Sequence, residues 1–169
     1  MPSSPDELFD VTDEQDNVIG QKPRWEVHQK NLLHRAVHIW VYRPDGKLVV
    51  HVRSETKDQY PSCFTSSASG HLDVGEDYLT AAHRELQEEL GIAAELEFLL
   101  KLPAGPQTAY EHTVVYQTVT DLELTPEAEE IAELKLFTME QVQQMVNESP
   151  EQFTPPFVEI VKALVGTRQ

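Results

Sequence analysis

A short acidic stretch in the middle of the chain contains residues whose types and spacing could bind a metal ion. Glu88 and Glu89 follow Glu85 by three and four positions, so an α-helix would place all three carboxylates on one face. Carboxylates this close repel one another unless a cation compensates their charge. Mg²⁺ prefers oxygen ligands and commonly completes its shell with water and substrate phosphates. The stretch therefore indicates a site for a divalent cation such as Mg²⁺ or Mn²⁺.

The same stretch has the pattern of an amphipathic helix over residues 77–90. Apolar residues recur along one side of it, and Gly91 follows the last of them, which is typical of a helix C-terminus. Gly70 lies in the loop before the helix, where we expect its backbone carbonyl to join the metal ligands. A solvated acidic face is the alternative interpretation for a helix this rich in glutamate. The apolar positions are Leu79, Ala82, Leu86 and Leu90.

Strand-like segments on both sides of this helix must build the surface that supports it. Polar residues 12–17 separate two such segments near the N-terminus, which predicts a hairpin of residues 7–11 and 18–22. A Pro-Asp-Gly turn joins two further segments, which we expect to pair. The pattern predicts an α/β (α+β) fold, with helices packed on a mixed, mainly antiparallel sheet. The other predicted strands are 36–42, 48–53, 94–102, 113–119 and 132–137, and the other predicted helices are 139–147 and 156–165.

The composition limits the classes of protein to which the chain can belong. Its 169 residues suit a single domain spanning 1–169, and 29 acidic against 13 basic residues give a net charge of −16. That charge opposes binding to nucleic acid or anionic membranes, so any anion site must be local. The single Cys63 excludes an intrachain disulfide. With no leader-like or membrane-spanning stretch, we expect a cytoplasmic protein, monomeric or homodimeric, and the composition does not exclude a small phosphorylated ligand.

One family signature matches the acidic stretch and the loop before it. Gly70, Glu76 and the run Arg-Glu-Leu-Gln-Glu-Glu-Leu-Gly-Ile from residue 84 resemble the Nudix box, which here would span residues 70–92. The resemblance implies the Nudix fold, an α/β/α sandwich around a mixed sheet, with its core at about residues 33–165. It also implies metal-dependent hydrolysis of a diphosphate linkage in a nucleoside diphosphate derivative or a similar small metabolite.

Carried over by position, this resemblance gives each charged residue of the box a role. Glu85, Glu88 and Glu89 would bind the metal with Gly70, and Glu88 or Glu89 would help to deprotonate the attacking water. Arg84 and Glu76 would form an ion pair that orients the loop and the helix.

Looser patterns place the chain near the branch of the family that contains isopentenyl diphosphate isomerase and its hydrolase-like relatives. Arg53 and Lys57 fall where that branch has cations that contact the diphosphate, although ordinary surface charge is the alternative. His34, His71 and Glu111 fall at three positions of a separate metal site in the isomerase. Imidazole and carboxylate ligands suit Zn or Mn, whereas structural hydrogen bonds are the alternative role for these histidines.

Two departures from the isomerase pattern favour hydrolysis. The isomerase needs a cysteine before the Gly-His pair, where this chain has Ser69, and a second acid where it has Thr113. Two alternatives stay open: an isomerase whose catalytic residues have changed, and a non-catalytic Nudix-fold sensor. The complete set of box carboxylates argues against the sensor.

Overall fold

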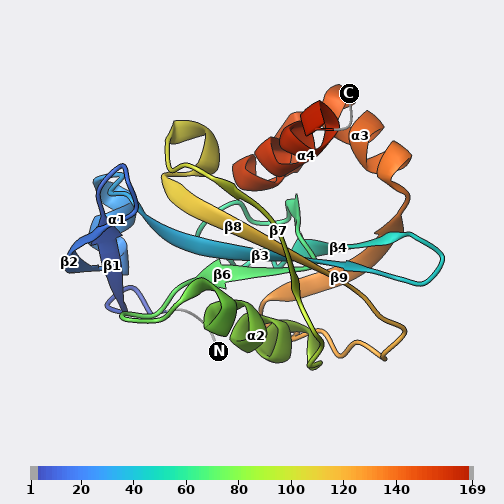
Figure 1. The fold of residues 1–169 in the computed structure, drawn as a ribbon, viewed down its shortest axis with the longest axis horizontal. Helices are drawn as coiled ribbons and strands as arrows, with labels where there is room; N and C mark the ends of the chain where they lie inside the picture. The colour runs from blue at the N-terminus through green and yellow to red at the C-terminus, as the bar shows by residue number, and fades with distance from the viewer. Residues whose placement is uncertain (1–3, 168–169) are drawn as a thin grey trace.

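A mixed seven-stranded sheet forms the centre of the protein in the computed structural model, which describes residues 4–167. Helix α2 (Tyr78–Leu90) covers one face of the sheet, and α3 (Met139–Glu148) and α4 (Pro155–Thr167) cover the other (Figure 1). The predicted α/β/α arrangement is confirmed. Within the described residues, no helix is both long enough and apolar enough to cross a bilayer.

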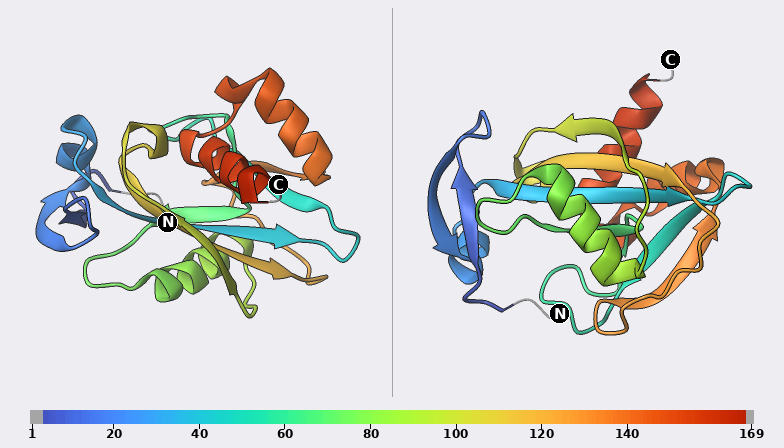
Figure 2. Two further views of the ribbon diagram at one scale, coloured as in Figure 1. Left: turned by 45° about the horizontal axis from the view of Figure 1, so that its top comes forward. Right: turned by 60° about the horizontal axis from the view of Figure 1, so that its bottom comes forward.

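The predicted N-terminal hairpin is also present. Strands β1 (Leu8–Thr12) and β2 (Val18–Pro23) form their own two-stranded sheet, followed by the short helix α1 (Arg24–Gln29). Two further views show this unit standing at one end of the central sheet (Figure 2). Its turn residue Asp16 ties it to the body, because its carboxylate accepts hydrogen bonds from Arg35 and Lys101, each at 2.6 Å.

Strand β3 (His34–Tyr42) is the organising strand of the central sheet. It pairs in parallel with β8 (Glu111–Val119), from His34 opposite Glu111 to Tyr42 opposite Val119. Alternate side chains enter opposite cores: Val37, Ile39 and Val41 pack in the layer beneath α2, whereas Trp40 packs with residues of α3 and α4. The other elements are β4 (Leu48–Arg53), β5 (Phe64–Thr65), β6 (Ala68–His71), β7 (Glu97–Leu102), β9 (Ile131–Phe137) and the 3-10 turns Pro106–Thr108 and Pro150–Gln152.

Strands β3 and β4 separate soon after the turn that joins them. Their predicted pairing is limited to Tyr42 opposite Leu48. Beyond that point β6 pairs with β3 and β5 pairs with β4, while β9 pairs along the other edge of β4 over its whole length. The divergence brings the β4–β5 loop and β6 to the side of the sheet where α2 places its carboxylates.

The strand limits differ in places from those that the sequence predicts. Strands β3 and β8 each begin two residues before the predicted start, and β7 begins at Glu97 rather than at residue 94. Helix α1 and the short strands β5 and β6 were not predicted. The two short strands lie in a Ser- and Thr-rich segment, where periodicity gives little signal.

A buried histidine on β4 makes the stability of this fold depend on pH. His51 is 2% exposed, and its Nδ1 has no hydrogen-bond partner within the described chain. Burial, together with the positive charge of Arg53, lowers its pKa from 6.5 to about 4. Between pH 4 and pH 6.5 the unfolded chain therefore binds more protons than the folded chain. The free energy of unfolding should therefore fall by up to about 1.4 kcal/mol for each pH unit from 6.5 toward 4.

The His51→Gln variant should show a flatter pH dependence in that range, because glutamine does not titrate. Urea unfolding at pH 7 and at pH 4.5 measures the difference. His83 is exposed on α2, so His83→Gln is the matched control and should keep the wild-type dependence. If the free energy of unfolding depends on pH equally in His51→Gln and in the wild type, His51 is not the cause of that dependence.

Candidate active site

Helix α2 forms where the sequence predicts it because its ends are well defined. The Asp77 side chain accepts a hydrogen bond from the Thr80 N–H at 2.8 Å, and Gly91 ends the helix with a φ of 70°. The buried side of α2 consists of Ala81, Ala82, Leu86, Glu89 and Leu90. Leu79 was expected on the apolar side but is 44% exposed. It lies in the first turn of α2.

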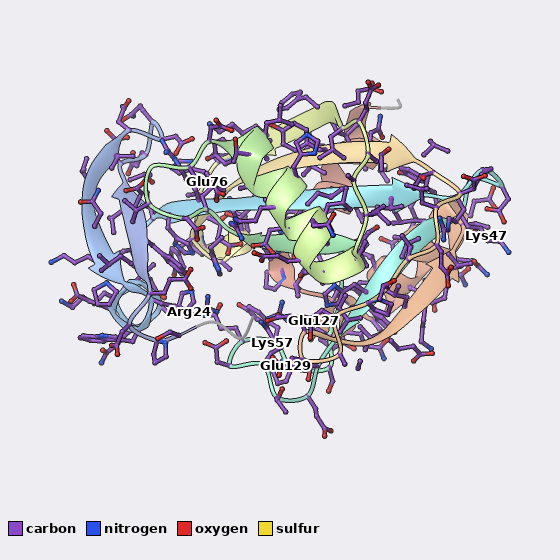
Figure 3. All side chains as sticks on the ribbon, turned by 90° about the horizontal axis from the view of Figure 1, so that it is seen from below. Arg24, Lys47, Lys57, Glu76, Glu127 and Glu129 are labelled. Carbon is purple, nitrogen blue, oxygen red and sulfur yellow. The ribbon has the colours of Figure 1, made fainter. Side chains whose placement is uncertain are left out.

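A cavity of about 430 Å³ lies beside α2 and is lined largely by polar residues. Helix α2 contributes Arg84 and all three predicted metal-binding glutamates, and β6 contributes Gly70 and His71. Arg53, Lys57 and Glu111 also line it, whereas Glu76 and His34 lie behind lining residues. Seen from the α2 side, Glu76 lies beside the start of the helix, and Lys57 lies on the loop below it (Figure 3).

The three glutamates differ in their surroundings. Glu89 is 5% exposed and accepts a hydrogen bond from the Ser69 N–H at 2.8 Å. Glu85 is also largely buried, whereas nearly half of the Glu88 side chain is exposed. Burial raises the pKa of both Glu85 and Glu89, and repulsion from neighbouring carboxylates adds to the rise. Buried carboxylates that repel one another fit a site for a divalent cation.

Gly70 allows the loop to approach α2 closely. A Cβ atom at this position would lie 2.3 Å from the carboxyl carbon of Glu85 and equally close to its Oε1. No side chain fits there unless Glu85 moves. Glycine at residue 70 therefore lets the backbone of β6 lie against the predicted metal-binding face without displacing the Glu85 carboxylate.

Arg84 joins the loop to the helix. Its guanidinium donates to both carboxylate oxygens of Glu76 at 2.8 and 2.9 Å, and to the carbonyl of His71 at 3.1 Å. Its third nitrogen donates to Glu85 Oε1 at 2.7 Å. Together these contacts raise the pKa of Arg84 and keep it charged. Arg84 therefore holds one of the predicted metal-binding carboxylates, that of Glu85, in a fixed position.

The two predicted phosphate-binding cations both reach the cavity, and both have protein partners. Arg53 donates twice to the carbonyl of Gln59, at 2.8 and 3.1 Å, which fixes the conformation of the β4–β5 loop. Lys57 Nζ lies 2.5 Å from Glu130 Oε2. A phosphate oxygen that binds Lys57 must therefore compete with Glu130.

A histidine cluster adjoins the cavity on the side of the hairpin. Glu111 Oε2 lies 2.8 Å from His71 Nε2 and 3.6 Å from His34 Nε2. His28, on α1, forms a set with His34 and His71, and the potential ligand atoms of these three histidines all lie within 4.8 Å of one another. Among residues 4–167, the buried Nε2 atoms of His28 and His34 have no hydrogen-bond partner, whereas His71 Nε2 faces the Glu111 carboxylate at 2.8 Å. An imidazole group of this kind suits a transition metal.

Two residues of this region escaped the sequence analysis. His28 was given no role, and Arg24 was not considered. Arg24 is buried at the cavity wall, donates to Asp58 at 3.3 and 3.4 Å, and lies 3.3 Å from His71 Nδ1. Both residues lie on α1, and their spacing shows no motif. Only the docking of the hairpin unit brings them to the site.

The fold and this carboxylate-lined cavity define a Nudix protein. The sequence profile of the NUDIX domain matches residues 32–157, and the chain belongs to this family. Its relatives include an isopentenyl-diphosphate Δ-isomerase of Serratia proteamaculans, 34% identical over 94% of this chain and 92% of the relative. A Nudix hydrolase of Streptomyces coelicolor is 36% identical over 78% and 75%. The solved structure of DR0079 from Deinococcus radiodurans covers 93% of this chain and 98% of its own, with 25% identity and a TM-score of 0.80.

Proposed function

We propose that this protein is a divalent-metal-dependent pyrophosphohydrolase that cleaves the diphosphate linkage of a nucleoside diphosphate derivative or a similar small metabolite. One observation carries the proposal. The carboxylates of Glu85, Glu88 and Glu89 enter the same cavity as the cationic groups of Arg53 and Lys57. Acidic groups to hold a metal and basic groups to hold phosphate are the two requirements of phosphoryl transfer.

The mechanism assigns roles to the side chains of the chain itself. Glu85, Glu88 and Glu89, with the carbonyl of Gly70, would hold Mg²⁺ or Mn²⁺. A bound divalent cation lowers the pKa of water and offsets the charge of the diphosphate. Glu89 is fixed by the Ser69 N–H at 2.8 Å, so it is well placed to accept the proton of the attacking water. Glu88 is the alternative base.

The cations then hold the substrate. Arg53 would bind diphosphate oxygens through the guanidinium nitrogen that Gln59 leaves available, and Lys57 would exchange Glu130 for a phosphate oxygen. The Arg84–Glu76 pair would keep Glu85 aligned during turnover. These steps place the negative substrate between metal and cations, inside a protein with a net charge of −16.

The isomerase alternative gains little support from the site. Ser69 stands where the isomerase has its cysteine, and its backbone N–H is bonded to Glu89. Thr113 is fully buried, and its hydroxyl donates to the Glu111 carbonyl at 3.1 Å. Cys63 lies in the β4–β5 loop and is not among the residues that line the described cavity. None of these side chains supplies the acid that protonation of carbon requires.

A hydrolysis screen tests the proposal. The substrates are nucleoside di- and triphosphates, nucleotide sugars, dinucleoside polyphosphates and prenyl diphosphates, each with Mg²⁺ and with Mn²⁺. We expect cleavage within the diphosphate of at least one nucleotide, loss of that activity with EDTA, and recovery with excess metal. Failure to turn over any substrate would favour the sensor alternative. Isomerisation of isopentenyl diphosphate without phosphate release would favour the isomerase.

We also propose that His28, His34 and His71, with Glu111, bind a transition metal such as Zn²⁺ or Mn²⁺. The unpaired Nε2 atoms of His28 and His34 support this role, because buried imidazole nitrogens seldom lack a partner. The prediction is that untagged protein incubated with one equivalent of Zn²⁺ and desalted retains it, whereas His71→Ala loses most of it. Metal content by mass spectrometry is the measurement, and His83→Ala on the exposed side of α2 is the control. Equal retention by His71→Ala would contradict the assignment.

A further inference from the structure

His38 is a buried side chain on the cavity wall for which the mechanism above has no use. It lies on β3, is 4% exposed, and lines the cavity together with Thr65 and Thr154. It points to the side of the sheet that α4 covers, as Trp40 does two residues later. These three residues form an uncharged part of a cavity wall that also carries many charged groups, and Arg53 and Glu111 lie close enough to act on the His38 ring.

The hydrogen bonds around His38 define which of its ring nitrogens carries the proton. Ser66 Oγ lies 2.7 Å from His38 Nδ1 and 2.8 Å from Trp40 Nε1. Indole N–H can only donate, so Ser66 accepts from Trp40. Among the described residues, the only acceptor within reach of the Ser66 hydroxyl is then His38 Nδ1. It follows that Nδ1 accepts and that Nε2 carries the hydrogen.

The Nε2–H of His38 is left as a fixed donor. No hydrogen bond joins it to another residue in the described part of the chain, and, unlike the Nε2 atoms of His28, His34 and His71, it is not sealed inside the protein. Its access is through the cavity that the residue lines. Burial also lowers the pKa of His38 to about 4, so the ring is neutral near pH 7 and is a poor partner for phosphate.

From this geometry we infer that His38 is a specificity-determining residue that donates its Nε2–H to an uncharged acceptor on the group attached to the diphosphate. The inference rests on the proposed function for the position of the diphosphate. A nucleoside supplies such acceptors, either as ribose hydroxyls or as base carbonyls and ring nitrogens. A prenyl chain supplies none and would leave the buried N–H unpaired. The Thr65 and Thr154 hydroxyls, 2.9 Å apart on the same wall, extend this polar, uncharged surface.

Binding of analogues that cannot be hydrolysed tests the inference independently of turnover. The ligands are the α,β-methylene analogues of ADP, CDP, GDP and UDP, the corresponding geranyl analogue, and bare methylenediphosphonate. Each is titrated by calorimetry with Mg²⁺ into the wild type, His38→Leu and His38→Gln. Leucine removes the donor at similar volume, whereas the glutamine amide can restore an N–H near the Nε2 position.

We expect the His38→Leu substitution to lower the binding affinity for at least one nucleoside analogue by about ten-fold, the loss typical of a buried hydrogen-bond donor. Bare methylenediphosphonate should bind all three proteins within about two-fold, and His38→Gln should recover most of the loss. Equal losses for all four nucleosides would assign the contact to ribose, and a loss confined to some would assign it to the base.

Three results would overturn the inference. One is an unchanged affinity of every nucleoside analogue for His38→Leu. Another is an equal loss for bare methylenediphosphonate, which would indicate a structural role for His38. The third needs no variant: tighter binding of the geranyl analogue than of every nucleoside analogue by the wild type. Because no step is hydrolytic, a failed hydrolysis screen would leave these results interpretable.

Discussion

The Glu89→Gln variant is expected to lower kcat by about 100- to 1,000-fold while the protein remains folded. A metal-bound catalytic carboxylate contributes several kcal/mol, and each ten-fold loss of rate corresponds to about 1.4 kcal/mol. Glutamine matches glutamate in shape, and its carbonyl oxygen can still accept the Ser69 N–H. The glutamine amide carries no negative charge to bind the metal, and it is not basic enough to accept a proton from the attacking water. Initial rates with the best substrate of the screen measure the effect.

Stability separates this loss from misfolding. Burial raises the pKa of Glu89, so the folded protein already favours an uncharged side chain there when no metal is bound. Without metal, the unfolding temperature of Glu89→Gln should therefore equal or exceed that of the wild type. When Mg²⁺ is added, the unfolding temperature of the variant should rise less than that of the wild type. Glu129, exposed on the loop before β9 (Figure 3), provides the control, and Glu129→Gln should keep wild-type rates. Near wild-type turnover by purified Glu89→Gln would remove Glu89 from the mechanism.

The parts of the fold that the sequence predicts well are those whose signals are local. Asp77 caps helix α2 and Gly91 ends it, so its limits depend only on nearby residues. The limits of β4 were predicted without error, because the Pro-Asp-Gly turn precedes it and its apolar run is short. The family was identified correctly from the Nudix box, since that motif consists of fixed spacings within one loop and one helix.

Contacts between distant segments could not be predicted in this way. The histidine cluster needs α1, β3 and β6 to meet, and α1 has only six residues, too few for a clear periodicity. The limited pairing of β3 with β4 follows from the competition of β6 for the edge of β3 and of β5 for the edge of β4. His38 has no motif at all, and only its bond to Ser66, 28 positions away, shows which nitrogen faces the cavity.

The N-terminal hairpin is hydrogen-bonded to the Nudix box, although the two segments are distant in sequence. Asp10 on β1 accepts the Gly75 N–H at 2.8 Å, and Tyr78, the first residue of α2, donates to Asp16 at 2.7 Å. These bonds join the hairpin unit to the loop and helix of the Nudix box. The box motif therefore contains the proposed metal ligands, and a segment more than 60 positions earlier is bonded to the loop and helix that carry them.

Replacement of Gly70 by alanine is the second large expected effect, and it should damage function far more than folding. The added Cβ would lie 2.3 Å from the carboxyl carbon of Glu85, and a flexible carboxylate can move away at little cost to the backbone. In moving, Glu85 would leave its position beside Arg84, to which it is bonded at 2.7 Å, and its expected place in the metal shell. We expect Mg²⁺ affinity to fall about ten-fold or more and kcat/KM about 100-fold.

Gly20→Ala is the matched control for this variant, because nothing lies within 4 Å of a Cβ at that position. It should leave the Mg²⁺ titration of activity and the unfolding temperature unchanged. The informative comparison is between metal dependence and stability. If Gly70→Ala keeps the wild-type Mg²⁺ dependence, Glu85 does not need its present position to bind the metal. If instead Gly70→Ala loses stability as strongly as activity, close approach at Gly70 serves the fold rather than the site. Loss of metal affinity in a protein of wild-type stability would support the carboxylate face of α2, held against the backbone of β6, as the metal site.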